Sequence, residues 1–245
     1  MLSNIKIYDQ NEENENLGYD NCDSFTNGEF FVVDFIINNG MMVFDIGANV
    51  GAWSKYVKSK HENCKINCFE PVKSTYNVLC ENFKDTDIKC NNYAISKDNK
   101  NKTFYFYGPT LQLSELSTLY QRSNEIEKRL NLKANRLIVN CITVDDFCKK
   151  NDIDTIDYLK IDTEGAEVDV LTGCEAMLQN NNINIIQFEY GGCCLDSGKT
   201  LQQVYNILKD KYNIYRILSD GLLYIKQWND NLENYLYCNY LAILK

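Results

Sequence analysis

VFDIGANVGAWS, residues 43–54, decides the fold of this chain. The run MMVFDIG (41–47) is short, continuous and apolar and ends in glycine, which is typical of a buried strand in a parallel sheet. Gly47 and Gly51 bracket the turn, where the backbone takes a positive φ or approaches a ligand closely. WSKYVKSK (53–60) then has helical character. Strand, glycine turn and helix in this order predict the opening unit of a Rossmann-like α/β domain.

Downstream of this unit, strands and helices alternate. The pattern predicts main strands at 65–71, 87–96, 156–162 and 183–190, and helices at 74–85, 144–151, 166–181 and 200–211. The runs 102–108 and 136–144 predict an added β-hairpin, and 213–219, 222–227 and 237–244 predict the closing strands. We expect a seven-stranded, mostly parallel, doubly wound sheet with an antiparallel strand near the C-terminus. Right-handed crossovers then place the loops that follow the strands at one edge, where ligands bind.

Upstream, residues 1–28 are polar and predict an N-terminal extension or a loose helix, and residues 29–40 predict a helix that ends in Asn-Asn-Gly. The division expected is therefore an extension, 1–28, and one domain, 29–245. No uncharged apolar run reaches the roughly 18–20 residues that span a bilayer, and the acidic start lacks the features of a signal peptide. The sequence therefore predicts no membrane span and a cytoplasmic location.

The charge and the cysteines argue against some kinds of site. The formal net charge is −9, which argues against a long nucleic acid as substrate, since phosphate binding needs basic patches. The chain has eleven cysteines but no C-x-x-C pair, and His61 is its one histidine. Cys64 and Cys68 fit a looser zinc spacing but lack a second pair. We expect buried free thiols and no metal site.

The glycine turn favours S-adenosylmethionine over a nucleotide. G-x-x-x-G lacks the middle glycine of the dinucleotide fingerprint, and no Gly-Lys-Ser/Thr follows it as in a Walker A loop. Asp45, at the end of the strand, can accept from the ammonium of the cofactor, and Asn49 can add a hydrogen bond. Glu70 ends the next strand about 20 residues beyond the turn, where a carboxylate takes both ribose hydroxyls.

A third strand is expected to bring NNYAIS (91–96) to the adenine. The loop after that strand flanks the base in this architecture. Asn91, Asn92 and Ala94 are the candidates for this edge of the pocket.

These motifs together resemble the FkbM family of methyltransferases. The resemblance is carried, in order, by VFDIGANVGAWS, CFEPVKSTYNVLCEN (68–82), NNYAIS, VDDF (144–147), DYLKIDTEGAEVDVLTG (157–173) and QFEY (187–190). It spans residues 29–245, although the stretch 109–135 departs from the pattern. It implies methyl transfer from S-adenosylmethionine, with S-adenosylhomocysteine as product, to a hydroxyl of a sugar, a glycan or another small molecule.

The fourth strand carries the candidate catalytic groups. Lys160 in a strand buried on both faces needs a charged partner, and Asp162 ends that strand at the ligand edge. An alcohol that is methylated loses a proton, so a base near its oxygen helps. Asp162 is the first candidate for the base or the group that orients the acceptor, and it is also a candidate for cofactor binding. Glu164 is the second candidate for the base, and Lys160 would tune the carboxylate of either residue. Glu189, at the end of the fifth strand, is a candidate for binding the acceptor.

Several alternatives stay open from the sequence alone. Glu164 and Glu167 can simply complement the dipole of the next helix, and the carboxylates can hold a divalent metal. Ser114, Ser117 and Thr118 belong either to a lid over the acceptor or to a capping segment of a surface helix. The chain can also be a silent binding module, an RNA ribose 2′-O-methyltransferase, or a glycosyltransferase using Asp85-Thr86-Asp87 or Asp152-Ile153-Asp154. The pattern sets no oligomeric state.

Overall fold

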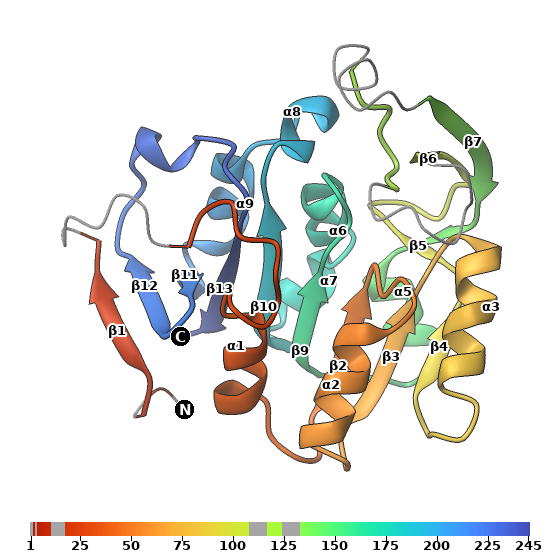
Figure 1. Ribbon diagram of the computed structural model, residues 1–245, viewed down its shortest axis with the longest axis horizontal. Coiled ribbons are helices and arrows are strands. Elements are labelled where there is room, and N and C mark those ends of the chain that lie inside the picture. The colour runs from red at the N-terminus through yellow and green to blue at the C-terminus, as the bar shows by residue number, and fades with distance from the viewer. Residues whose placement is uncertain (1, 3, 11–17, 108–116, 124–132) are drawn as a thin grey trace.

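The fold is built on a nine-stranded sheet, seen in a computed structural model that describes residues 2, 4–10, 18–107, 117–123 and 133–245 (Figure 1). The five strands β10, β9, β2, β3 and β4 run parallel, and β13 is antiparallel to both β10 and β11. This confirms the predicted Rossmann-like α/β class. The strand order is β1 (Lys6–Asp9), β12 (Gly221–Ile225), β11 (Tyr212–Leu218), β13 (Cys238–Leu244), β10 (Ile183–Tyr190), β9 (Ile156–Ile161), β2 (Met42–Ile46), β3 (Lys65–Phe69) and β4 (Lys89–Asn91).

Helices cover both faces of this sheet (Figure 1). On β2 and β9, Val43 and Tyr158 join one apolar cluster while Phe44 and Leu159 join the other, since successive side chains point to opposite faces. The first cluster includes residues of α1 (Glu29–Ile36), α2 (Ala52–Lys60) and α3 (Lys73–Asn82). The second includes residues of α5 (Val144–Lys150), α6 (Glu167–Thr172), α7 (Glu175–Gln179), α8 (Cys193–Ser197) and α9 (Leu201–Leu208). A doubly wound domain requires both layers.

The predicted hairpin is confirmed, because β6 (Lys102–Tyr107) and β7 (Ala134–Val139) pair in antiparallel register. The single strand expected over 87–96 is wrong. Its first part is β4 of the main sheet, and its second part is β5 (Ala94–Ile95), which pairs with β8 (Cys141–Ile142) in a separate sheet. The break at residues 92 and 93 carries the chain away from the main sheet.

The single helix expected over 166–181 is also wrong, because α6 ends at Thr172 and α7 begins at Glu175. The chain passes the Ser96 backbone at Gly173, where an added Cβ would lie 2.3 Å from the carbonyl oxygen of Ser96. This close approach interrupts the helix.

At the other end of the sheet, the predicted closing strands are present as β11, β12 and β13, and β1 lies beyond β12, so the sheet has nine strands where seven were expected. β1 belongs to the segment expected as an extension or loose helix, and it pairs with β12 from Lys6 opposite Gly221 to Asp9 opposite Tyr224. The domain boundary at residue 29 stays a prediction.

No helix in the described ranges combines the length and the apolar content needed to cross a membrane.

Candidate active site

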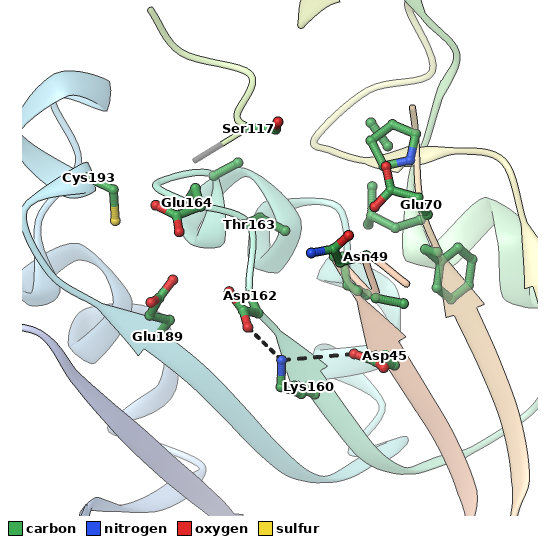
Figure 2. A pocket seen from close by; sticks show the side chains of 18 of the residues that line it. Asp45, Asn49, Glu70, Ser117, Lys160, Asp162, Thr163, Glu164, Glu189 and Cys193 are labelled. Carbon is green, nitrogen blue, oxygen red and sulfur yellow. Dashed lines mark hydrogen bonds and ion pairs between the residues drawn. The ribbon is translucent and has the colours of Figure 1, made fainter. Parts of the chain in front are cut away.

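A cavity of about 740 Å³ opens at the carboxyl ends of β2, β3, β9 and β10. This size falls within the range of roughly 300–1,000 Å³ found for small-molecule sites. Figure 2 shows Glu70 at one end and Glu164, Glu189 and Cys193 at the other, with Asn49 and Asp162 between them. The loops after four neighbouring strands therefore share one cavity, as the topology requires.

Asp45 is a buried carboxylate next to the end of β2. Its Oδ2 accepts a hydrogen bond of 2.7 Å from Ser54 Oγ, whereas its Oδ1 has no hydrogen-bond partner. Burial raises the pKa of Asp45, against the opposing effects of Lys160 and Ser54. A buried acceptor that borders a cavity and lacks a partner is available to a donor on a ligand.

The glycine turn between Gly47 and Gly51 borders the cavity and is held in place by contacts with other parts of the protein. Gly47 has φ +85°, and the Gly47 and Ala48 N–H groups both donate to the carbonyl of Phe69. Gly51, at φ +89°, does not line the cavity, because it packs against the ring of Phe83, 2.4 Å from where its Cβ would be. Of the predicted cofactor residues in this turn, Gly47 and Asn49 line the cavity.

Asn49 adopts a left-handed conformation with φ +48°, which an asparagine tolerates better than most residues. Figure 2 shows its side-chain amide between Glu70 and Asp162. The turn thus presents a polar side chain at the middle of the cavity.

Glu70 is buried at the end of β3. Its Oε1 accepts a 2.8 Å hydrogen bond from the Val72 N–H, and burial raises the pKa of Glu70 to about 8 in spite of the backbone donors of Val72 and Asn49. Asn92 does not line the cavity. Its amide donates to the carbonyls of Glu70 and Pro71, so it shapes the Glu70 turn from outside, while Ala94 does line the cavity.

Lys160 has the charged partners that its burial requires. Its Nζ lies 2.7 Å from Asp162 Oδ2 and 3.9 Å from Asp45 Oδ1 (Figure 2). Burial lowers the pKa of Lys160, but the charges of Asp162 and Asp45 outweigh this effect and raise it above the ordinary value. The Asp162 side chain is 39% exposed, which makes it the most accessible of these three cavity-lining side chains.

Glu164 is held by a segment that lies far away in the sequence. Arg122 Nη2 lies 2.6 Å from Glu164 Oε2, and Thr118 Oγ1 donates to the Glu164 carbonyl over 2.7 Å. Glu164 has φ +55°, which is an uncommon conformation for glutamate. Burial raises the pKa of Glu164 to about 7, although Arg122 opposes this shift.

Glu189 lies at the end of β10 and is only 8% exposed, with no partner for its Oε2. Burial raises its pKa well above the ordinary value, and the charges of Asp162 and Glu164 add to this effect. The four predicted catalytic residues, Lys160, Asp162, Glu164 and Glu189, all line the same cavity. Glu167 instead accepts from the Thr163 hydroxyl and from the N–H groups of Thr163 and Gly165, so it organises the loop after β9.

Sequence reasoning missed Trp53, Arg122, Cys193 and Tyr237, which also line the cavity. Lys160 Nζ lies 5.7 Å from the centre of the Trp53 ring. Because Trp53 stands two residues after Gly51, its position next to the glycine turn could have indicated that it lines the cavity. Arg122 and Tyr237 lie in loops, and Cys193 begins the five-residue helix α8, so none of the three belongs to a periodic pattern that the sequence shows. Of the segment expected as a lid or cap, Ser117 lines the cavity, and Ser114 lies outside the described residues.

The cavity therefore combines two kinds of chemistry. Asp45 and Glu70 can accept hydrogen bonds from an ammonium and from hydroxyls at one end. Asp162, oriented by Lys160, and the acidic groups around Glu189 can bind or deprotonate a second molecule at the other end. His61 takes no part, because its Nε2 lies 3.0 Å from the Val33 carbonyl outside the cavity.

Comparison with known proteins agrees with the resemblance seen in the motifs. Residues 45–215 match the family model described as the methyltransferase FkbM domain. The chain is 28% identical over 157 residues to "Methyltransferase sdnD" of Sordaria araneosa, covering 54% of this chain and 60% of that protein. It is 24% identical over 147 residues to "Methyltransferase 1" of Beauveria bassiana (strain ARSEF 2860), covering 54% and 58%. The chain thus spans about three fifths of the length of these relatives.

A solved structure shares the fold. The crystal structure of methyltransferase FkbM from Methylobacillus flagellatus KT has a TM-score of 0.54 at 14% identity, covering 89% of this chain and 47% of that one. At this identity the likeness concerns the fold alone.

Proposed function

The chain belongs to the FkbM methyltransferase family, and on this premise we propose that it is an S-adenosylmethionine-dependent O-methyltransferase that acts on a hydroxyl of a small molecule or a carbohydrate. One observation carries the proposal. The Oδ1 of Asp45, which accepts no hydrogen bond within the protein, and the buried carboxyl of Glu70 border the same cavity as Asp162 and Glu189. A cofactor end and an acceptor end are therefore joined within one cavity of suitable size.

The residues present fit the proposed cofactor. Asp45 Oδ1 lacks a hydrogen-bond partner and can accept from an ammonium, and Glu70 can accept from two hydroxyls of a ribose. Asn49 and Ala94 also line this cavity. When bound, S-adenosylmethionine supplies a methyl carbon that carries a sulfonium leaving group.

Asp162 is the proposed base. Its carboxylate faces the cavity and is held through Oδ2 by Lys160, which leaves the other oxygen for the acceptor. An alcohol must lose its proton when its oxygen gains a methyl group, and Asp162 can take that proton. Because Lys160 also pairs with Asp45, one buried ammonium fixes the base relative to the cofactor end. Fixing this geometry is what in-line transfer requires.

Glu164 and Glu189 are the proposed acceptor-binding groups. They border the end of the cavity away from Glu70, and Arg122 holds Glu164 in place. We also propose a cytosolic location, because all eleven cysteines are free thiols, as a reducing compartment would keep them.

The test has two parts. Isothermal titration of the folded protein with S-adenosylmethionine is expected to give one site with a Kd of roughly micromolar order, worth about 8 kcal/mol. Transfer of labelled methyl groups is then measured on a panel of hydroxyl compounds with S-adenosylhomocysteine release as the second readout. Absence of binding up to millimolar cofactor would overturn the proposal, and transfer to nitrogen or carbon alone would overturn its O-methyl part.

A further inference from the structure

Three side chains that can bind a metal meet at the acceptor end of the cavity. Glu164 follows β9, Glu189 is the second-last residue of β10, and Cys193 is the first residue of α8. One carboxylate oxygen of each glutamate and the Cys193 Sγ all lie within 4.8 Å of one another. Figure 2 shows these three groups facing the same space. Ligand atoms around a tetrahedral zinc ion lie about 3.6 Å apart, given bond lengths of 2.0–2.3 Å. Small side-chain rotations would bring the three groups to that separation.

Glu189 gives a second, independent reason to look for a ligand here. It is more than nine-tenths buried, and its Oε2 has no hydrogen-bond partner. Leaving a buried carboxylate oxygen unpaired is costly, so native structures retain such a group where something else binds it. Asp162 and Glu164 add negative charge around Glu189, which a cation would offset.

We propose that Glu164, Glu189 and Cys193 bind a divalent zinc ion in this cavity. The thiol decides the class of metal, because thiolate ligands select zinc over the hard cations magnesium and calcium. Three protein ligands on one side and open space on the other are typical of a catalytic zinc site, which keeps one position for a water or a substrate. The binding of the ion stands independently of the proposed methyl transfer.

Arg122 is compatible with this site. Its bond with Glu164 runs through Oε2, so Oε1 can serve as the ligand atom. Ligating carboxylates are commonly hydrogen-bonded by a neighbouring residue that fixes their orientation. Arg122 would have this positioning role, and Asp196, 3.8 Å from Arg122 Nη1, would balance its charge.

The open position of the ion faces the cavity. An acceptor hydroxyl bound there would be polarised and would lose its proton to Asp162 more readily. This role rests on the proposed function, whereas occupancy of the site does not. The sequence predicted no metal site because the three ligands come from a loop, a strand and a helix and have no zinc-knuckle spacing.

The test uses metal binding to the full chain without any cofactor. The protein is stripped with a chelator and titrated with Co²⁺, whose bond to a thiolate gives a near-ultraviolet charge-transfer band, and Zn²⁺ affinity is measured by competition with a chromophoric chelator. We expect one ion per chain. Cys193→Ser should abolish the band and weaken Zn²⁺ binding by about 100-fold or more, and Glu189→Gln by about 10- to 100-fold.

Cys148→Ser is the matched control, since Cys148 is a buried free cysteine of α5 that neither lines the cavity nor belongs to the three-ligand set. It should keep the band and an affinity within about threefold of the starting chain, because it changes neither a ligand nor a group that hydrogen-bonds a ligand. Circular dichroism confirms folding of each variant, and Glu189→Gln decides the matter if Cys193→Ser does not fold. No band in the starting chain, or an unchanged band in Cys193→Ser, would overturn the zinc site. Titration of the stripped protein with S-adenosylmethionine tests the proposed function separately, so the two failures are distinguishable.

Discussion

The carbonyl oxygen of Asp162 occupies the place where Gly47 would carry a Cβ atom, 1.8 Å from that position. The turn after β2 and the end of β9 are therefore in backbone contact, and the Asp162 N–H also donates to the carbonyl of Ile46 over 3.0 Å. The proposed base is thus positioned by the same turn that borders the cofactor end. No side chain fits between them.

Gly47→Ala is expected to destabilise the fold strongly. The substitution adds a backbone clash to a φ of +85°, and the left-handed region alone costs roughly 1–2 kcal/mol for a residue with a Cβ. With the clash included we expect a loss of about 3 kcal/mol or more, which lowers Tm by roughly 6–12 °C in a chain of this size. Thermal unfolding measures the change.

Gly192→Ala is the control for this prediction, because its φ is −60° and an added Cβ there has no heavy atom within 4 Å. Its Tm should stay within about 2 °C, as expected for an uncrowded site. Equal effects at positions 47 and 192 would show that the contact with Asp162 does not matter.

Lys160→Met is expected to lower the free energy of unfolding by about 3–5 kcal/mol, since it leaves the buried Asp45 without a countercharge. Asp45→Asn in the same chain should restore part of that loss, because the uncompensated charge is then gone. Chemical denaturation of the two variants checks both values. A double variant no more stable than Lys160→Met would disprove the coupling between the two residues.

Part of this site followed from the sequence because its signals are local. Asp45, Gly47 and Glu70 stand at strand ends, and a strand end is set by a few neighbouring residues. The need of Lys160 for a partner followed from the polarity of one strand. The same local pattern could not show that position 51 must be glycine because the ring of Phe83 leaves no room for a Cβ atom there.

The other end of the cavity depends on contacts between distant segments. Arg122 reaches Glu164 across 42 positions, and Tyr237 joins the cavity from the loop before the last strand. Such loops carry no periodic pattern, and their side chains are brought together only by the completed sheet. Asn92 shows the converse, since it was expected at the adenine and instead holds the Glu70 turn from outside.

Asp162→Asn should separate binding from turnover. The amide keeps the shape of the side chain but cannot take a proton, so we expect methyl transfer to fall by about 100-fold or more. The Kd for S-adenosylmethionine should stay within about threefold, because Asp45 and Glu70 are unchanged. Titration and the transfer assay measure the two effects. Full turnover in this variant would move the role of base to Glu164 or Glu189, and the corresponding Glu→Gln variants would decide between them.

Glu70 should make both cofactor affinity and stability depend on pH. Its pKa in the folded chain is about 8, above the ordinary value of 4.5, so the folded state favours the protonated carboxyl. The free energy of unfolding is therefore expected to fall as pH rises from about 4.5 to about 8, since the unfolded chain loses this proton first. Ribose hydroxyls bind best to the ionised carboxylate, so the affinity for S-adenosylmethionine should instead increase over pH 6.5–8.5 and then level off.

Glu70→Gln tests both parts, because the amide does not titrate. At pH 9 this variant should unfold at a Tm several degrees above that of the starting chain, as removal of a buried charge worth a few kcal/mol implies. It should also bind S-adenosylmethionine at least about tenfold more weakly, with little dependence on pH, since loss of one charged hydrogen-bond acceptor amounts to roughly 1.5–3 kcal/mol. Calorimetric titrations at four pH values and melting curves at pH 6 and pH 9 give the comparison. A pH-dependent affinity that persists in Glu70→Gln would place the titrating group elsewhere in the cavity.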